Sequence, residues 1–162
     1  MAELDRAVWT DDDFDSMGWH DASVHGIGFV EGEQPWLGRL LLDIDYIVEW
    51  VRPVPPSTSL SFRVAPATLV FEEAIDLSLR LSAGSVTFGV ALQVLRLHRG
   101  RARSEALAPT HHDYRIEGAD FDLRFTAARY RQVFRSRPVA SPRQTLSAAR
   151  RGLPSFSTEP FA

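Results

Sequence analysis

The 162-residue chain contains no cysteine and no lysine. The lack of cysteine excludes a disulfide framework, a thiolate-ligated zinc site, an iron–sulfur cluster and a cysteine nucleophile. The lack of lysine excludes a Schiff-base lysine and the lysine of a phosphate-binding P-loop. All 18 basic residues are therefore arginines, which carry a permanent charge on a planar group suited to carboxylates and phosphates.

Long apolar runs are missing as well. No stretch approaches the roughly 18 apolar residues of a membrane-spanning helix, and the acidic amino terminus lacks the basic start and apolar run of a signal peptide. With the lack of cysteine, these features predict a cytoplasmic protein that does not contact a membrane. The GxSxG, GxGxxG, P-loop and HExxH motifs are also absent, which favours a non-enzymatic protein without a cofactor.

The remaining composition is typical of one globular domain. Hydrophobic residues make up 44% and charged residues 24% of the chain, and the formal net charge is -3. We expect a single domain over residues 1–162, with a helical lead-in over residues 1–18. Residues 153–162 are irregular and predict a folded-back arm or a flexible tail.

Alternation of apolar and polar residues with a period of two predicts a chain made mainly of strands. Two of these strands, separated by a turn over residues 31–35, predict an antiparallel hairpin. The alternation shifts by one residue near Val94, which indicates a β-bulge, and residues 99–113 have the polarity of a loop. The expected strands are residues 23–30, 39–50, 60–64, 68–72, 75–81, 86–98, 114–116 and 121–125.

Capping signals predict two short helices. Thr10 begins a capping box before a helix over residues 11–17 that ends at Gly18, and Ser141 begins a helix over residues 142–150. The strands do not alternate with helices, so a βαβ architecture is excluded. We therefore expect a mainly β (α+β) fold: a single antiparallel sheet, a sandwich or a partly open barrel of about eight strands, with short amino- and carboxy-terminal helices.

Charge is divided along the chain. Residues 1–50 hold twelve acidic residues against two arginines, whereas residues 124–151 hold eight arginines and no acid. In one interpretation the two parts lie together in the fold and their charges offset each other. In the other, the arginine-rich segment binds an acidic partner protein, while the near-neutral total charge disfavours nucleic acid. The residues proposed for this partner face are Arg129, Arg131, Arg135 and Arg137.

Two groups of histidine and aspartate carry the ligand types of a divalent metal site. The first contains His20, Asp21 and His25, and the second contains His111 and His112. Imidazole and carboxylate ligands hold zinc or manganese, provided that the two groups meet in space. The alternative for His25 is a half-buried histidine with a partner inside the fold.

Asp43 and Asp45 lie on one face of the predicted strand over residues 39–50. Two neighbouring carboxylates bind a cation, or one of them has a raised pKa. The alternatives are a solvated face or pairing with the arginines near the carboxy terminus. On the other face of the strand, Trp50 continues an apolar stripe and is expected in the core.

Four segments of the chain form a recognisable set. They are Gly18-Trp19-His20-Asp21-Ala22; Leu42-Asp43-Ile44-Asp45-Tyr46-Ile47 with Trp50; Val64-Ala65-Pro66-Ala67-Thr68-Leu69-Val70-Phe71; and Arg135-Ser136-Arg137-Pro138 with Gln144-Thr145-Leu146 and Arg150. Together they resemble an uncharacterised family of small bacterial proteins, over about residues 17–151. No activity is established for that family, so the resemblance implies no residue roles. His20-Asp21 before an alternating strand is also similar, over the first hairpin alone, to bacterial toxin-immunity proteins.

Three functions remain open. The first is a non-enzymatic interaction protein, immunity-like in kind, that binds through a charged sheet face or the arginine-rich segment. The second is a metal-dependent hydrolase that uses the two histidine groups and a divalent metal. The third is a small-molecule-binding barrel whose cavity is lined by the tryptophans and by Phe29, Phe62 and Phe88. No feature of the sequence indicates an oligomeric state.

Overall fold

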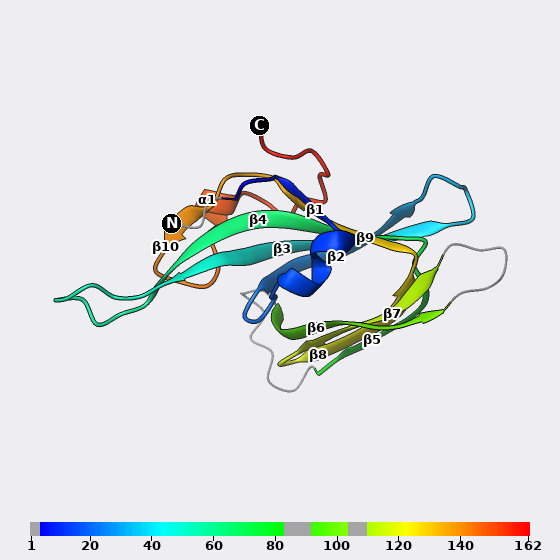
Figure 1. Ribbon diagram of the computed structural model, residues 1–162, viewed down its shortest axis with the longest axis horizontal. Coiled ribbons are helices and arrows are strands. Elements are labelled where there is room, and N and C mark those ends of the chain that lie inside the picture. Colours follow the sequence, from blue (N-terminus) through cyan, green and yellow to red (C-terminus); the bar gives the residue numbers. More distant parts are fainter. Residues whose placement is uncertain (1–3, 83–91, 104–109) are drawn as a thin grey trace.

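The computed structural model describes residues 4–82, 92–103 and 110–162. These residues form a mainly antiparallel β structure with one open sheet of ten strands, which confirms the expected fold class (Figure 1). In chain order the elements are β1 (Val8–Thr10), the 3₁₀ helix η1 (Asp11–Ser16), β2 (Ser23–Glu31), β3 (Gly38–Val51), β4 (Ser61–Glu72), β5 (Ile75–Leu81), β6 (Leu92–Arg103), β7 (His111–Gly118), β8 (Phe121–Ala127), β9 (Arg129–Phe134), β10 (Val139–Ser141) and α1 (Ala148–Arg151).

The sheet bends over itself so that its strands lie in two layers (Figure 1). Neighbouring strands follow the order β1-β9-β4-β3-β2-β6-β7-β8-β5, and β10 pairs with β4. Strands β5 to β8 form the lower layer, and the other strands form the upper layer. The chain crosses between the layers at Glu73–Ala74 and again at Ala128, whose N–H donates to the Glu72 carbonyl at 2.9 Å. Glu73 has a φ of 54°, a left-handed conformation at the turn from β4 into β5.

The main core lies between the two layers. Leu40 and Leu42 of β3 point into it and are fully buried. From β4, Phe71 packs edge-on against Tyr114 and Phe125 of the lower layer, with ring centroids 4.9 and 4.6 Å away.

A small apolar pocket between the layers has a volume of about 10 Å³. Small-molecule sites usually have about 300–1,000 Å³, so this pocket lacks the space that a ligand-binding barrel needs. Two of the phenylalanines expected to line such a cavity do not do so: Phe29 is 66% exposed, and Phe62 belongs to a separate cluster with Ile47 and Leu146. Phe88 lies outside the described residues.

Strand β4 joins two of the expected strands, residues 60–64 and 68–72, into one. On one edge it pairs with β3 along its length, and on the other edge its partner changes from β10 to β9. Pro66 lies at this change of partner, so its missing N–H costs no hydrogen bond of the ladder. Its carbonyl accepts the N–H of Arg135 at 3.0 Å.

The expectation of a loop over residues 99–113 is wrong, because β6 continues to Arg103 and β7 begins at His111. Polar side chains fill these strand ends because one face of the lower layer is turned to solvent. The expected strand residues 86–91 lie outside the described residues. Strands β1, β9 and β10 add to those that the sequence predicts.

The predicted bulge near Val94 is confirmed. The register of β6 against β7 shifts directly after this residue. Val94 and Leu97 are therefore both buried, whereas Leu95 between them is 45% exposed.

A second bulge, in β3, makes the expectation for Trp50 wrong. The register of β3 against β4 shifts between Ile47 and Glu49, which turns the following side chains to the opposite face. Trp50 therefore leaves the main core, is 44% exposed and packs against the ring of Phe62 at 5.1 Å.

Both predicted helices are shorter than expected. The first is η1, where the Asp13 carboxylate accepts the Thr10 N–H at 2.9 Å as a capping box requires. The second reduces to the single turn of α1, because Ser141 belongs to β10. Thr145 and Leu146 bind a carboxylate of β3, which holds them out of a helix.

Replacing Leu42 by alanine is expected to lower the free energy of unfolding by about 2–5 kcal/mol, because the side chain is fully buried between the layers. Urea denaturation followed by circular dichroism measures this change. Leu153 is 85% exposed and provides the control, since Leu153→Ala should change the stability by less than about 0.5 kcal/mol. Equal losses in the two variants would contradict a core at this position.

Candidate functional site

A dense cluster of ionisable side chains lies on the back face of the upper layer, the face turned away from the main core. Asp43 and Asp45 of β3 point to this face, and both are 0% exposed. The Asp43 carboxylate accepts hydrogen bonds from Arg151 at 2.7 and 3.1 Å, from the Ser155 N–H at 2.9 Å and from the Arg135 guanidinium. Each oxygen of Asp43 thus has two donors, which compensates for the loss of water.

Asp45 receives donors from three parts of the chain. Its Oδ2 atom accepts from His25 Nε2 at 3.0 Å, from the Thr145 hydroxyl at 2.7 Å and from the Leu146 N–H at 2.8 Å. Its Oδ1 atom accepts from Arg151 Nε at 3.0 Å. Burial by itself would raise the pKa of Asp45, but these hydrogen bonds and the charge of Arg151 outweigh it and hold the pKa well below its usual value. The carboxylate therefore stays ionised inside the fold.

Arg151 bridges the two carboxylates and so joins α1 to β3. Its side chain is 3% exposed, and all three of its guanidinium nitrogens donate to Asp43 or Asp45. Burial lowers the pKa of a guanidinium, but the two carboxylates outweigh this effect and raise the pKa of Arg151. Together with Arg135, the cluster holds two positive and two negative groups, so its charges cancel.

His25 reaches this cluster because of a bulge in β2. The register against β3 shifts between Val24 and Gly26, which makes His25 an additional residue on its strand. Its side chain is 16% exposed and lies 3.0 Å from Asp45. The interpretation of His25 as a half-buried histidine with an internal partner is confirmed.

Residues 144–157, which we call the strap, cross the back face and cover the cluster. The ring of Phe156 in the strap lies over Gly26 and Gly28 of β2. A Cβ atom at these glycines would come within 3.0 and 3.1 Å of the ring, so glycine at both positions makes room for it.

Further hydrogen bonds fix the two ends of the strap. At its start, Gln144 Nε2 donates to Asp21 Oδ2 at 2.9 Å. Towards its end, Arg135 Nη1 donates to the Ser155 carbonyl at 2.9 Å, and the Thr68 hydroxyl donates to the Ser157 carbonyl at 2.7 Å. The sheet therefore forms hydrogen bonds with the main chain of the strap as well as with its side chains.

These pairs support the first interpretation of the divided charge, in which the acidic and basic parts offset each other. Asp43 and Asp45 from the acidic part contact Arg135 and Arg151 from the basic part at hydrogen-bond distance. The interpretation that the two parts offset each other within the fold is confirmed for these residues.

The residues proposed as metal ligands are not brought together: His25 lies in the buried cluster, and the others lie in two separate places. His20 Nδ1 is 3.0 Å from Asp21 Oδ2, and the Asp21 N–H donates to the Val94 carbonyl. Val94 pairs with Gly118, so this group lies at one end of β7. His111 and His112 begin β7 at its other end, about 20 Å away along the strand. Among the described residues, no group of three or more histidine, aspartate or glutamate side chains is arranged to hold a metal ion.

The four arginines proposed to bind a partner have different surroundings. Arg135 belongs to the buried cluster, with a side chain that is 12% exposed. Arg131 lies 3.6 Å from Glu72, and Arg137 donates to the Ala162 carbonyl at 3.1 Å. Arg129 is exposed, and its guanidinium makes no hydrogen bond or ion pair within the described ranges.

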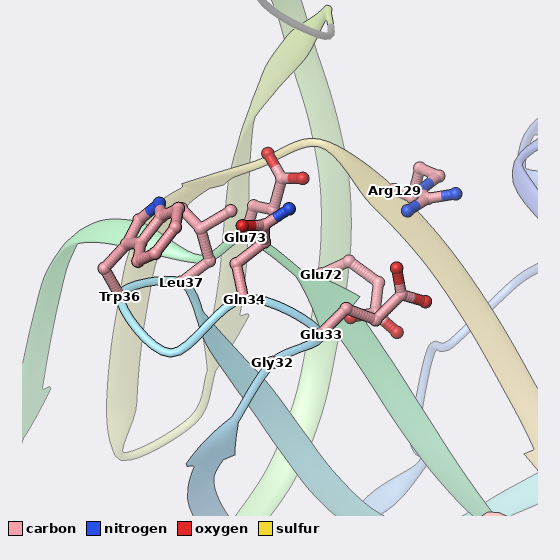
Figure 2. A pocket seen from close by; sticks show the side chains of 8 residues that line it. All are labelled: Gly32, Glu33, Gln34, Trp36, Leu37, Glu72, Glu73 and Arg129. Carbon is pink, nitrogen blue, oxygen red and sulfur yellow. The ribbon is translucent and has the colours of Figure 1, made fainter.

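Arg129 lines a cleft at the end of the upper layer where β2 turns into β3 (Figure 2). The cleft has a volume of about 330 Å³, and a second hollow of about 270 Å³ adjoins it and shares Glu33, Glu72 and Arg129. Figure 2 shows Trp36 at one side of the cleft and Arg129 at the other, with carboxylates between them. The lining residues are Gly32, Glu33, Gln34, Trp36, Leu37, Glu72, Glu73 and Arg129.

The turn that carries Trp36 is held by its own backbone. The Gly32 N–H donates to the Leu37 carbonyl at 2.7 Å, and the Leu37 N–H donates to the Gln34 carbonyl at 3.0 Å. Trp36 projects from this closed turn with 77% of its surface exposed. The sequence analysis names Trp36 among the tryptophans expected to line a barrel cavity, whereas it lines this surface cleft. A tryptophan inside a polar turn of glycine, glutamate and proline is itself a signal of such exposure.

Comparison with known proteins gives no relative for this chain: no protein-family model, curated protein or solved structure matches it. In the described part of the chain, no helix has the length and apolar character needed to cross a membrane.

The stability of the protein should fall as the pH decreases from about 5 to 2. The pKa of Asp45 is lowered in the folded state, so in this range the unfolded chain takes up a proton that the folded protein does not. The contribution of Asp45 is present above its unfolded pKa and is lost towards its folded pKa. Urea denaturation at several pH values should show a smaller decrease in Asp45→Asn than in the wild type.

The same variant should also be less stable than the wild type at pH 7, because Arg151 loses one of its buried charge partners. Glu31→Gln, which removes an exposed carboxylate at the end of β2, is the control and should follow the wild-type curve. An Asp45→Asn curve parallel to that of the wild type would show that Asp45 does not contribute to the pH dependence.

Proposed function

We propose that this chain is a non-enzymatic binding protein that holds a partner protein at the cleft beside Trp36. The observation that carries this proposal is the combination of Trp36, 77% exposed on a closed turn, with an exposed Arg129 that has no side-chain partner among the described residues. We place this binding in the cytoplasm, in keeping with a chain free of cysteine.

The residue types at the cleft are those that contribute most to protein–protein binding. Tryptophan and arginine are enriched among the few residues that supply most of the affinity of an interface. Trp36 offers a large apolar surface on a turn whose hydrogen bonds are already formed, so little conformational entropy is lost when it is covered.

The cleft carries both signs of charge, and Arg129 is the side chain in it that would bind an acidic group of the partner. Glu72 is already bound by Arg39 at 2.6 Å and lies 3.6 Å from Arg131, whereas Arg129 has no such carboxylate in the part of the chain that the structure describes. A carboxylate of the partner would form paired hydrogen bonds with the exposed guanidinium of Arg129. An immunity-like role, in which the chain covers a surface of another protein, is one form of this function.

The surroundings of the other ionisable residues support a binding role over a hydrolytic one. Beneath the strap, Asp45 is hydrogen-bonded to His25 and Arg151, and Asp43 is hydrogen-bonded to Arg151. These side chains are therefore not exposed to a substrate. The two histidine groups that a metal-dependent hydrolase would use lie at opposite ends of β7.

A random peptide library displayed on phage tests the proposal. Peptides enriched on the wild-type protein should combine an acidic residue with an apolar one, and synthetic copies should bind Trp36→Ala and Arg129→Gln about tenfold or more weakly. This loss corresponds to about 1.4 kcal/mol and is measured by fluorescence anisotropy.

Matched controls lie on the opposite hairpin, between β3 and β4. Trp50→Ala and Arg52→Gln remove an exposed tryptophan and an exposed arginine and should leave the affinity unchanged. Enriched peptides that bind both cleft variants as tightly as the wild type would place the binding surface elsewhere and overturn the proposal.

A further inference from the structure

The strap is attached to the back face in the way that a bound peptide is attached to its receptor. Two of its N–H groups, at Leu146 and Ser155, donate to side chains of the sheet, and two of its carbonyls, at Ser155 and Ser157, accept from side chains of the sheet. These contacts are independent of the identity of the strap residues, so they set its path and register rather than its sequence.

Side chains make the sequence-dependent contacts of the strap: Gln144, Thr145 and Leu146 at its start, and two further anchors beyond them. Arg151 donates to both Asp43 and Asp45, and Phe156 places its ring over Gly26 and Gly28. The contact of the guanidinium with two carboxylates is specific in charge. The contact of the ring with two glycines, which have no side chains, is specific in shape.

The strap is anchored largely by ionic contacts, whereas the main core is held by apolar packing. A buried ion pair costs desolvation on both partners and stabilises a fold no better than apolar side chains of the same volume. Its advantage is specificity, because an uncompensated charge strongly disfavours any other occupant or register. The carboxylates of Asp43 and Asp45 therefore select a segment that brings an arginine to this place.

We infer that the groove formed by Asp43, Asp45, Gly26 and Gly28 is a binding site for a protein segment with an arginine five residues before a phenylalanine, and that the strap is its intramolecular occupant. A partner with this pair of side chains takes the place of the strap when the strap lifts away. The groove is separate from the cleft beside Trp36, so the two proposals stand or fall independently.

The connection to the strap allows this exchange. Pro142 and Arg143, which join β10 to the strap, are exposed and belong to no strand or helix, so the strap can lift while β10 stays paired with β4. Because the strap is tethered, it competes at a high effective concentration, and a free segment binds only while the strap is lifted or cut.

Hydrogen exchange of the intact protein is the first test. The amides of Leu146 and Ser155 donate to the groove carboxylates, and local lifting of the strap exposes them without unfolding the sheet. We expect them to exchange about 100-fold or more faster than the amides of β3 around Leu42. Equal rates would mean that the strap opens only when the whole protein unfolds, and would overturn the inference.

A cleavable variant gives the second test. A protease site inserted between Arg137 and Pro138 cuts the chain ahead of β10 and the strap while keeping every residue of both parts. A fluorescent peptide of residues 138–162 should then bind the cut protein saturably and should bind the uncut protein at least about tenfold more weakly.

Variant peptides identify the anchor. The peptide with Arg151→Gln should compete about tenfold or more weakly than the wild-type peptide, whereas Arg143→Gln, at an exposed position, should compete equally well. Equal competition by the Arg151→Gln peptide would overturn the inference. Loss of the circular-dichroism signal on cutting would also overturn it, because the strap would then be part of the folding core rather than a ligand.

Discussion

The bridge from Arg151 to Asp43 and Asp45 is the interaction on which the back of this molecule depends. The two aspartates are fully buried at the centre of the upper layer, where an ionised carboxylate without donors would be severely destabilising. The strap supplies most of the donors, and Arg135 and His25 supply the others. The position of α1, the path of the last twenty residues and the bulge at His25 are all consistent with this one requirement. The strap is therefore held by charge, whereas the two layers of the sheet are held by apolar packing.

Strand β3 is the place where these two kinds of packing meet. Its side chains alternate between the main core, which receives Leu40 and Leu42, and the back face, which receives Asp43 and Asp45. Central strands buried on both faces are usually apolar throughout. Here one face is acidic and is still buried, because the carboxy-terminal arginines fold over it. The division of charge along the sequence is thus a feature of how the chain packs, and only part of the arginine-rich segment is left for a partner.

Local sequence patterns predicted the features that depend on neighbouring residues. The hairpin of β2 and β3, the capping box at Thr10 and the bulge at Val94 all follow from alternation or capping within a few residues. The sequence does not predict β9, because its alternating arginines indicate a charged segment as readily as one face of a strand. The helix expected after Ser141 does not form because Asp45, about a hundred residues away, binds Thr145 and Leu146. The sequence offers pairing of Asp43 and Asp45 with carboxy-terminal arginines as one alternative. Which arginines form the pairs, Arg135 and Arg151, depends on the completed fold.

The geometry of Arg151 also bears on the absence of lysine from the chain. At an exposed position such as Arg143, an ammonium group on a flexible stem would serve as well as a guanidinium. At position 151, three nitrogens in one plane reach two carboxylates that lie two residues apart on a strand. A single ammonium nitrogen cannot span that separation, so a lysine that reached Asp45 would leave Asp43 with only Arg135 and the Ser155 N–H as donors. At position 151, therefore, arginine is favoured by the stereochemistry of the site as well as by its charge.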